Sequence, residues 1–147
     1  DVFKHFLKWY RKNNKNEIDL IIHLRPTTPF RSLHLVNKAI GLIIKNKNYD
    51  SLRCFKESDF SPYKMWIKFH NLAKPLFYHN KKELHSMARQ QLPQTYNHIG
   101  IIDILRPKRT IDKNSMVGKK TFCFLVKDLK NYVDIDNKTD LKTAEKL

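Results

Sequence analysis

Residues 23–31 read His23-Leu24-Arg25-Pro26-Thr27-Thr28-Pro29-Phe30-Arg31 and end a nearly continuous apolar stretch over residues 18–24. Such a stretch predicts a strand covered on both faces, as in a parallel sheet. The turn that follows combines prolines, hydroxyls and two guanidinium groups at the carboxyl end of this strand, the edge where open α/β sheets bind ligands. Because arginine forks suit carboxylate or phosphate, the stretch predicts an anion-handling α/β domain.

Helical periodicity flanks this strand on both sides. Apolar residues recur at helical spacing over residues 2 to about 13 and again over 33–44, where Ser32 is placed to cap the second helix. A short strand is expected over residues 52–55. The order helix, strand, helix, strand predicts an α/β fold with a mostly parallel sheet, flanking helices and right-handed crossovers.

The middle of the chain has a different pattern. From residue 61 to 77, large apolar side chains alternate with lysines and Trp66, which predicts an antiparallel excursion projecting from the domain. Both faces of this segment carry bulky apolar groups, so a hairpin alone cannot bury them. We expect residues 61–82 to be a dimerisation segment that packs against another subunit.

The remaining elements are predicted from the same periodicities. Residues 83–97 are polar and are expected to form an ordered loop, whereas strands are expected over 99–105, 120–126 and 133–136. Leu141, Ala144 and Leu147 share one face of a closing helix that Asn137 is placed to cap.

Composition limits the class of protein. With 147 residues and 41% hydrophobic residues, the chain fits one globular domain, and its apolar runs are far shorter than the roughly 20 residues that cross a bilayer. The net charge of +15 resembles that of nucleic-acid-binding proteins, but the lysines are scattered and no nucleic-acid motif accompanies them. Two widely separated cysteines, Cys54 and Cys123, indicate buried, reduced thiols in a cytoplasmic protein.

Two acidic residues could hold a metal ion. Asp134 and Asp136 alternate across Ile135, so in an extended backbone their carboxylates lie on one side, just before the closing helix. This arrangement suits Mg²⁺ or Mn²⁺, which bind few carboxylates and leave positions open for phosphate oxygens. The alternative is that one carboxylate caps the helix and the other is solvated.

The basic candidates are less specific individually. Lys64 lies among aromatic residues in SPYKMW, where its stem could simply cover apolar surface. Arg31 and Arg89 could equally be surface residues. No motif pairs a histidine with a serine or cysteine nucleophile, so covalent catalysis of that kind is not indicated.

Five motifs in order form a recognisable set: HLRPTTPFR, SPYKMW, RQQLPQTY, NSMVGK and VDIDNKTDLKTAE. Together they resemble the acylneuraminate cytidylyltransferase family, whose members make CMP-activated sialic acids and related nonulosonic acids. The resemblance runs along the whole chain and corresponds to the C-terminal two thirds of the family.

This resemblance implies a dimeric enzyme with a Rossmann-like fold. The anomeric hydroxyl of a nonulosonic acid would attack the α-phosphate of CTP, releasing pyrophosphate with the help of Mg²⁺. By motif matching, Asp134 and Asp136 are the metal ligands and, with Lys64, the catalytic residues. The residues matched to substrate binding are Arg25, Thr27, Thr28, Arg31, Lys64, Arg89 and Gln90.

The chain departs from the family in two ways. The N-terminal strand and its nucleotide loop of the type Ala-Arg-x-Gly-Ser-Lys are missing, and the first residues look like the interior of a longer protein. Arg25 stands where sialic acid enzymes commonly have Gln, Asn97 where they have Arg, and Asp103 near a position that is commonly aromatic. The identity of the sugar acid is therefore open, with a legionaminic-type sugar as reasonable as sialic acid.

Two other functions stay open at this point. The chain could be a non-catalytic module that binds a sugar acid or another anion, having lost the nucleotide half. A basic nucleic-acid-binding protein is the less favoured alternative, and its affinity would fall steeply with salt.

Overall fold

The computed structural model describes residues 2–78 and 83–147, which form two compact units. The first, here called the sheet unit, comprises Asp1–Phe55 and His98–Leu147, and the second, the hairpin unit, comprises Lys56–Asn97. Each unit is described by itself. The last four residues of the expected excursion, 79–82, lie outside the described residues.

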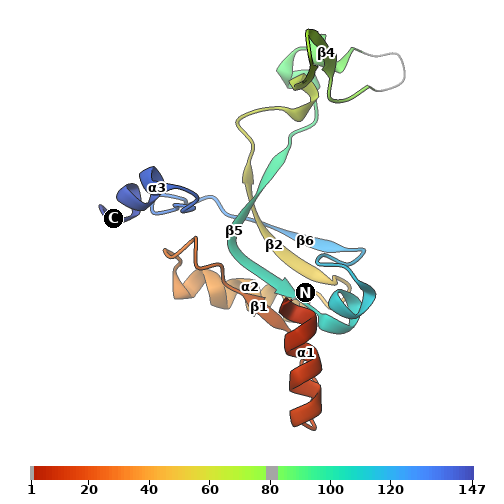
Figure 1. Ribbon diagram of the computed structural model, residues 1–147, viewed down its shortest axis with the longest axis vertical. Coiled ribbons are helices and arrows are strands. Elements are labelled where there is room, and N and C mark those ends of the chain that lie inside the picture. The colour runs from red at the N-terminus through yellow and green to blue at the C-terminus, as the bar shows by residue number, and fades with distance from the viewer. Residues whose placement is uncertain (1, 79–82) are drawn as a thin grey trace. The chain divides into compact units, whose positions relative to one another are not determined.

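The sheet unit contains a mixed sheet (Figure 1). Its strands are β1 (Ile21–His23), β2 (Ser51–Glu57), β5 (Tyr96–Leu105) and β6 (Thr121–Leu125), in the order β1-β5-β2-β6. Strand β1 runs antiparallel to β5, and β2 runs parallel to β6.

The prediction of a mixed α/β chain is confirmed, but the expected mostly parallel sheet is wrong. Only β2 and β6 form a parallel pair among the described strands. The reason is that β5, returning from the hairpin unit, enters the sheet between β1 and β2. The alternation of helices and strands along the sequence predicts direction but does not exclude such an insertion.

Helix α2 (Leu33–Lys45) packs on the sheet because its apolar face repeats at helical spacing. Ala39 and Ile43 are fully buried and share a core cluster with Leu52, Ile102 and other residues of β2, β5 and β6. The helix begins as predicted, since the Ser32 hydroxyl accepts a hydrogen bond from the Leu35 N–H at 3.1 Å.

The sheet unit contains two other helices. Helix α1 (Val2–Asn13) contributes Leu7 to a second cluster with Leu105 and Ile111. Helix α3 (Lys138–Ala144) begins with a capping box in which Asn137 and Asp140 satisfy each other's backbone N–H groups, as the sequence predicts for Asn137. Short 3₁₀ turns, η4 (Pro107–Arg109) and η5 (Ile111–Lys113), follow β5.

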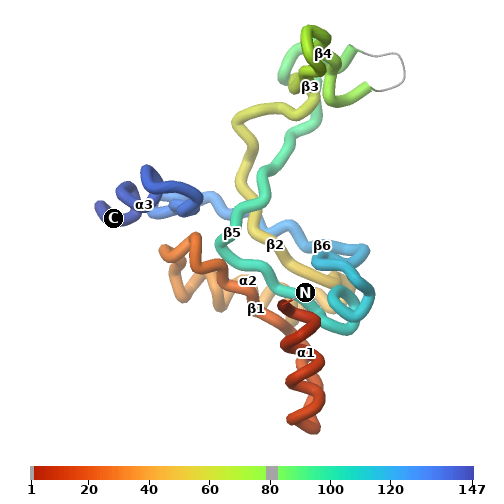
Figure 2. Tube along the Cα trace, in the orientation of Figure 1, coloured from red at the N-terminus to blue at the C-terminus, as the bar shows by residue number. Residues whose placement is uncertain are grey.

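The hairpin unit contains the predicted antiparallel excursion. Strands β3 (Trp66–Phe69) and β4 (Leu72–Pro75) pair antiparallel across a tight turn in which His70 adopts a left-handed φ of 53°. The expected ordered loop contains 3₁₀ turns η2 (Leu84–Ser86) and η3 (Arg89–Gln91), and η1 (Pro62–Lys64) precedes β3. Figure 2 follows the chain out of β2, through this unit and back into β5.

Three local expectations are wrong. The strand predicted over 18–24 is shortened to β1, and the segment 133–136 forms no strand of the described sheets. Cys54 is buried as expected, and burial raises the pKa of its thiol to about 12, but Cys123 is exposed.

Among the described residues, no helix is both long and apolar enough to cross a bilayer.

We predict that Ser32→Ala lowers the free energy of unfolding by about 1 kcal/mol, because the Leu35 N–H loses its capping acceptor. Chemical denaturation measures the change. Ser32→Asp is the control, because aspartate keeps a capping acceptor and should retain stability. Ser115→Ala does not serve as a control, since the Ser115 hydroxyl itself accepts hydrogen bonds from two backbone N–H groups. An unchanged midpoint for Ser32→Ala would contradict the capping role.

Candidate functional site

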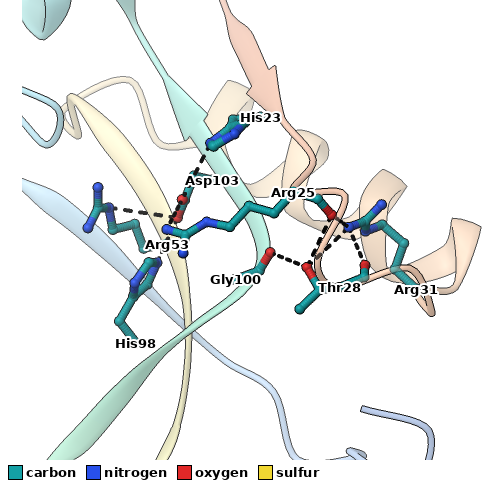
Figure 3. Close-up of polar contacts among 8 residues, drawn as sticks. All are labelled: His23, Arg25, Thr28, Arg31, Arg53, His98, Gly100 and Asp103. Carbon is teal, nitrogen blue, oxygen red and sulfur yellow. Dashed lines mark hydrogen bonds and ion pairs between the residues drawn. The ribbon is translucent and has the colours of Figure 1, made fainter. Parts of the chain in front are cut away.

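The turn after β1 is fastened to β5 by a buried hydroxyl (Figure 3). Thr28 is 1% exposed, and its Oγ1 donates to the carbonyl of Gly100 at 2.7 Å. Its backbone N–H donates to the Arg25 carbonyl at 3.2 Å. A hydroxyl buried without such partners would be costly, so these bonds hold the turn in one conformation against the sheet.

Arg31 braces the same turn from the other side. Its guanidinium donates to the carbonyl oxygens of Arg25 and Thr28 and to the Thr28 hydroxyl. Arg31, which sequence matching assigns to substrate binding, therefore uses its Nη2 group to stabilise the turn. Its contribution to a ligand site is positioning rather than an open guanidinium.

A buried carboxylate gathers four basic side chains beside the turn. The Asp103 side chain is only 4% exposed, and it lies on β5. Its Oδ2 accepts a hydrogen bond from Arg25 Nη2 at 3.1 Å, and its Oδ1 lies 2.8 Å from His98 Nε2. Asp103 also forms an ion pair with Arg53 Nε at 3.7 Å and lies 3.9 Å from His23 Nδ1, a contact that becomes an ion pair only when the imidazole is protonated (Figure 3).

Gly100 makes room for this cluster. A Cβ at this position would lie 2.8 Å from Arg25 Cδ, so glycine lets the arginine lie close across β5 toward Asp103. Aromatic contacts orient the two imidazoles: the His98 ring packs edge-to-face on Phe55, and the His23 ring on Phe3. Burial lowers the pKa of His23, although the Asp103 carboxylate opposes the effect.

The predicted acidic pair lies next to the turn. The Ile135 N–H donates to the Thr27 carbonyl at 2.8 Å, which fixes the backbone between Asp134 and Asp136 beside the turn. Asp134 is half-buried and Asp136 is exposed. The pKa of Tyr132 is raised, first by burial and then by the nearby Asp134 carboxylate.

The donor chemistry of this pair fits a hard divalent cation in part. Two carboxylates two residues apart could hold Mg²⁺ together with water and phosphate oxygens. Within residues 2–78 and 83–147, however, no group of three or more metal-ligating side chains converges. The Asp140 carboxylate is occupied by the N–H groups of Asp136 and Asn137, so it serves the helix cap.

The remaining predicted site residues lie in the hairpin unit. Lys64 Nζ is 3.5 Å from the His85 carbonyl, Arg89 Nη2 donates to the Asp59 carbonyl at 2.7 Å, and Gln90 is exposed in η3. The structure brings Arg25, Thr27, Thr28, Arg31, Asp134 and Asp136 together within the sheet unit. Lys64, Arg89 and Gln90 belong to the hairpin unit, which is described by itself, so the structure does not bring them together with the residues of the sheet unit.

A groove of about 890 Å³ opens in the sheet unit between the start of α2 and the segment after β6. Its lining is mixed, with apolar side chains beside basic ones, and includes Arg31, Lys38, Phe124, Lys127, Lys130 and Tyr132. Lys38 Nζ lies 5.8 Å from the centre of the Phe124 ring, within the range of a cation–π contact. The groove shares Arg31 and Tyr132 with the turn and the acidic segment.

Sequence reasoning missed Arg53, His98 and the role of Asp103. One signal was present: Asp103 is the acidic residue in the otherwise apolar run from Ile99 to Leu105. An aspartate in a strand buried on both faces requires charged or hydrogen-bonding partners. Nothing in the sequence indicated which of the 29 lysines and arginines would supply them.

Comparison with known proteins adds no assignment to this geometry. Neither a protein-family profile nor a curated protein matches the chain.

We predict that His23→Gln flattens the pH dependence of stability below about pH 6.5, the usual pKa of histidine. Because burial lowers the pKa of His23, the unfolded chain binds this proton more readily, so the free energy of unfolding falls as pH drops through this range. Denaturation of the wild type and the variant between about pH 7.5 and 5 measures the slopes.

The surrounding charges define the control for this prediction. Asp103 favours the protonated ring, whereas Arg25, Arg31 and Arg53 disfavour it. His5→Gln, which removes an exposed histidine from α1, should leave the slope as it is in the wild type. Equal slopes for the wild type and His23→Gln would show that burial of this imidazole does not contribute to acid sensitivity.

Proposed function

We propose that this protein is a cytidylyltransferase that transfers CMP from CTP to a nonulosonic acid. The observation that supports the proposal best is the hydrogen bond from Ile135 N–H to the Thr27 carbonyl. It joins two motifs from opposite ends of the chain, an acidic pair and a cationic turn. A nucleotidyl transfer to an acid sugar needs both, one for a phosphate-bound metal and one for a carboxylate.

The proposal gives each group a task. Arg25 attracts the acid sugar, and Thr27, Thr28 and Arg31 hold the turn that shapes its pocket. Asp134 and Asp136 would hold Mg²⁺, which would withdraw charge from the phosphates. The anomeric hydroxyl forms a bond from its oxygen to the α-phosphorus and loses its proton to solvent, while the bond to the departing pyrophosphate breaks. Catalysis therefore consists mainly of positioning and electrostatics.

Lys64, Arg89 and Gln90 enter the proposal through the resemblance alone. The resemblance matches all three to binding of the acid sugar. A Rossmann-like ancestry of the sheet unit is part of the same proposal, supported by the parallel β2–β6 pair and by the packing of α2 on the sheet. A cytoplasmic location is also proposed, in keeping with the free thiols of Cys54 and Cys123.

Pyrophosphate release tests the reaction. The full-length protein incubated with CTP, Mg²⁺ and a panel of nonulosonic acids should release pyrophosphate and form a CMP-sugar. Asp136→Asn should reduce turnover by at least about a hundredfold, because the metal loses a charged ligand while the backbone contact at Ile135 remains.

Asp19→Asn is the matched control, since it makes the same change of charge at an exposed aspartate outside the acidic segment. It should retain wild-type turnover. Silence with every sugar acid in the panel would count against the enzyme, and full activity of Asp136→Asn would show that the metal assignment is wrong.

A non-catalytic anion-binding module is the second candidate. The cluster of basic side chains around Asp103 favours it, because that cluster needs no nucleotide to attract an anion. This candidate predicts that a sugar acid binds equally well with and without CTP and that no pyrophosphate forms.

A homodimer is proposed from the surface of the hairpin unit. Trp66 and Phe69 in β3 are 51% and 53% exposed, and Leu72 in β4 is 55% exposed. A two-stranded hairpin with both faces apolar is marginally stable alone, and a second copy could cover it.

We predict that Trp66→Ser combined with Phe69→Ser shifts the protein from dimer to monomer in analytical ultracentrifugation. Lys68→Ser, on the same exposed strand, is the control and should leave the dimer intact. A monomeric wild type, or a double variant that remains dimeric, would argue against this interface.

A further inference from the structure

Arg53 has a buried side-chain nitrogen, Nε, that makes no hydrogen bond within the described residues. It lies on β2 with a side chain only 21% exposed. Its nearest anionic atom is Asp103 Oδ1, at 3.7 Å from Nε, which is an ion-pair distance beyond hydrogen-bond range. Within the described residues its Nε is buried and has no hydrogen-bond partner. The rest of this partly exposed guanidinium also donates no hydrogen bond to the described residues, so its outer nitrogens are available to an anion.

Arg25 has the same deficit on the opposite side of Asp103. One of its nitrogens, Nη2, donates to Asp103 Oδ2 at 3.1 Å, but its Nε is buried and unpartnered among the residues described. Two permanent cations therefore approach one carboxylate. That carboxylate also lies 2.8 Å from His98 Nε2, so the two arginines share it with an imidazole.

The local charge favours an anion. Arg25 and Arg53 bring two positive charges against the single negative charge of Asp103, and the nearby Arg31 adds to the positive excess. A ligand carboxylate carries a single negative charge, and its planar oxygens match guanidinium forks.

We propose that Arg25 and Arg53 form a clamp that binds the carboxylate of the ligand, with Asp103 as the positioning residue that holds both arginines. This inference rests on the proposed function for the identity of the ligand, a nonulosonic acid. It assigns the recognition of the acid group to β2 and the β1 turn, within one unit of the protein. Arg53 is thereby a binding residue that no motif in the sequence marked.

Binding of N-acetylneuraminic acid and its methyl ester, measured by isothermal titration calorimetry, tests the clamp. The wild type should bind the acid more tightly than the ester. Arg53→Met should weaken binding of the acid by about tenfold to a hundredfold, the range for losing a charged hydrogen bond, and should leave binding of the ester unchanged. Lys45→Gln, which removes an exposed charge at the far end of α2, should bind both ligands like the wild type.

A second variant guards against misfolding. Arg53→Lys keeps the charge but lacks the planar fork, so it should lose part of the preference for the acid while retaining the circular dichroism spectrum of the wild type. If Arg53→Met does not fold, this variant decides the outcome. Wild-type affinity for the acid in either folded variant, or equal binding of acid and ester by the wild type, would overturn the clamp.

Sodium acetate and benzoate separate this inference from the proposed function. If they bind with dependence on Arg53 while no nonulosonic acid binds, the clamp stands and the proposed substrate is wrong. If a nonulosonic acid is activated with CTP but its binding does not depend on Arg53, the proposed function stands and the clamp is wrong. If no carboxylate binds to the wild type, the clamp is also wrong.

Discussion

The buried carboxylate of Asp103 is the constraint around which the sheet unit is arranged. A charge that is 4% exposed is tolerated in an apolar strand only if cations and donors surround it. Those partners are His23 and Arg25 from β1 and its turn, Arg53 from β2 and His98 from β5. The pairing of these strands and the contacts of Asp103 therefore depend on each other. The absence of a side chain at Gly100 allows the turn to come close enough for Arg25 to take part.

The same cluster would connect stability with the proposed binding of an anion. If every arginine in this network were fully paired, the network would stabilise the fold but would have no free donor for a ligand. Here two arginines face one carboxylate, and the Nε atoms of Arg25, Arg31 and Arg53 are buried without acceptors among the described residues. Such incomplete satisfaction costs folding free energy and is typical of sites that a ligand completes. The hydrogen bond between Ile135 and Thr27 fixes the acidic segment beside the turn that carries Arg25, as the proposed metal-assisted reaction requires.

Features that depend on local sequence were the ones that could be predicted. Helical periodicity and a serine cap correctly gave α2, and the Asn137 cap gave α3, because the side chain and its backbone partner are close in sequence. The alternating pattern gave the β3–β4 hairpin for the same reason. Strand neighbours were not predicted, since periodicity reports how a strand is buried and carries no information on which strand lies beside it.

The sequence alone determined the elements, the charge excess and two short motifs, the Pro-Thr-Thr-Pro turn and the Asp-Ile-Asp segment. These are encoded by residues within one turn or one strand of each other. The tertiary structure decided that β5 separates β1 from β2 and that Asp103 meets Arg25 and Arg53. Ion pairs between distant residues depend on strand order, and strand order results from burying all apolar faces at once, which no local pattern specifies.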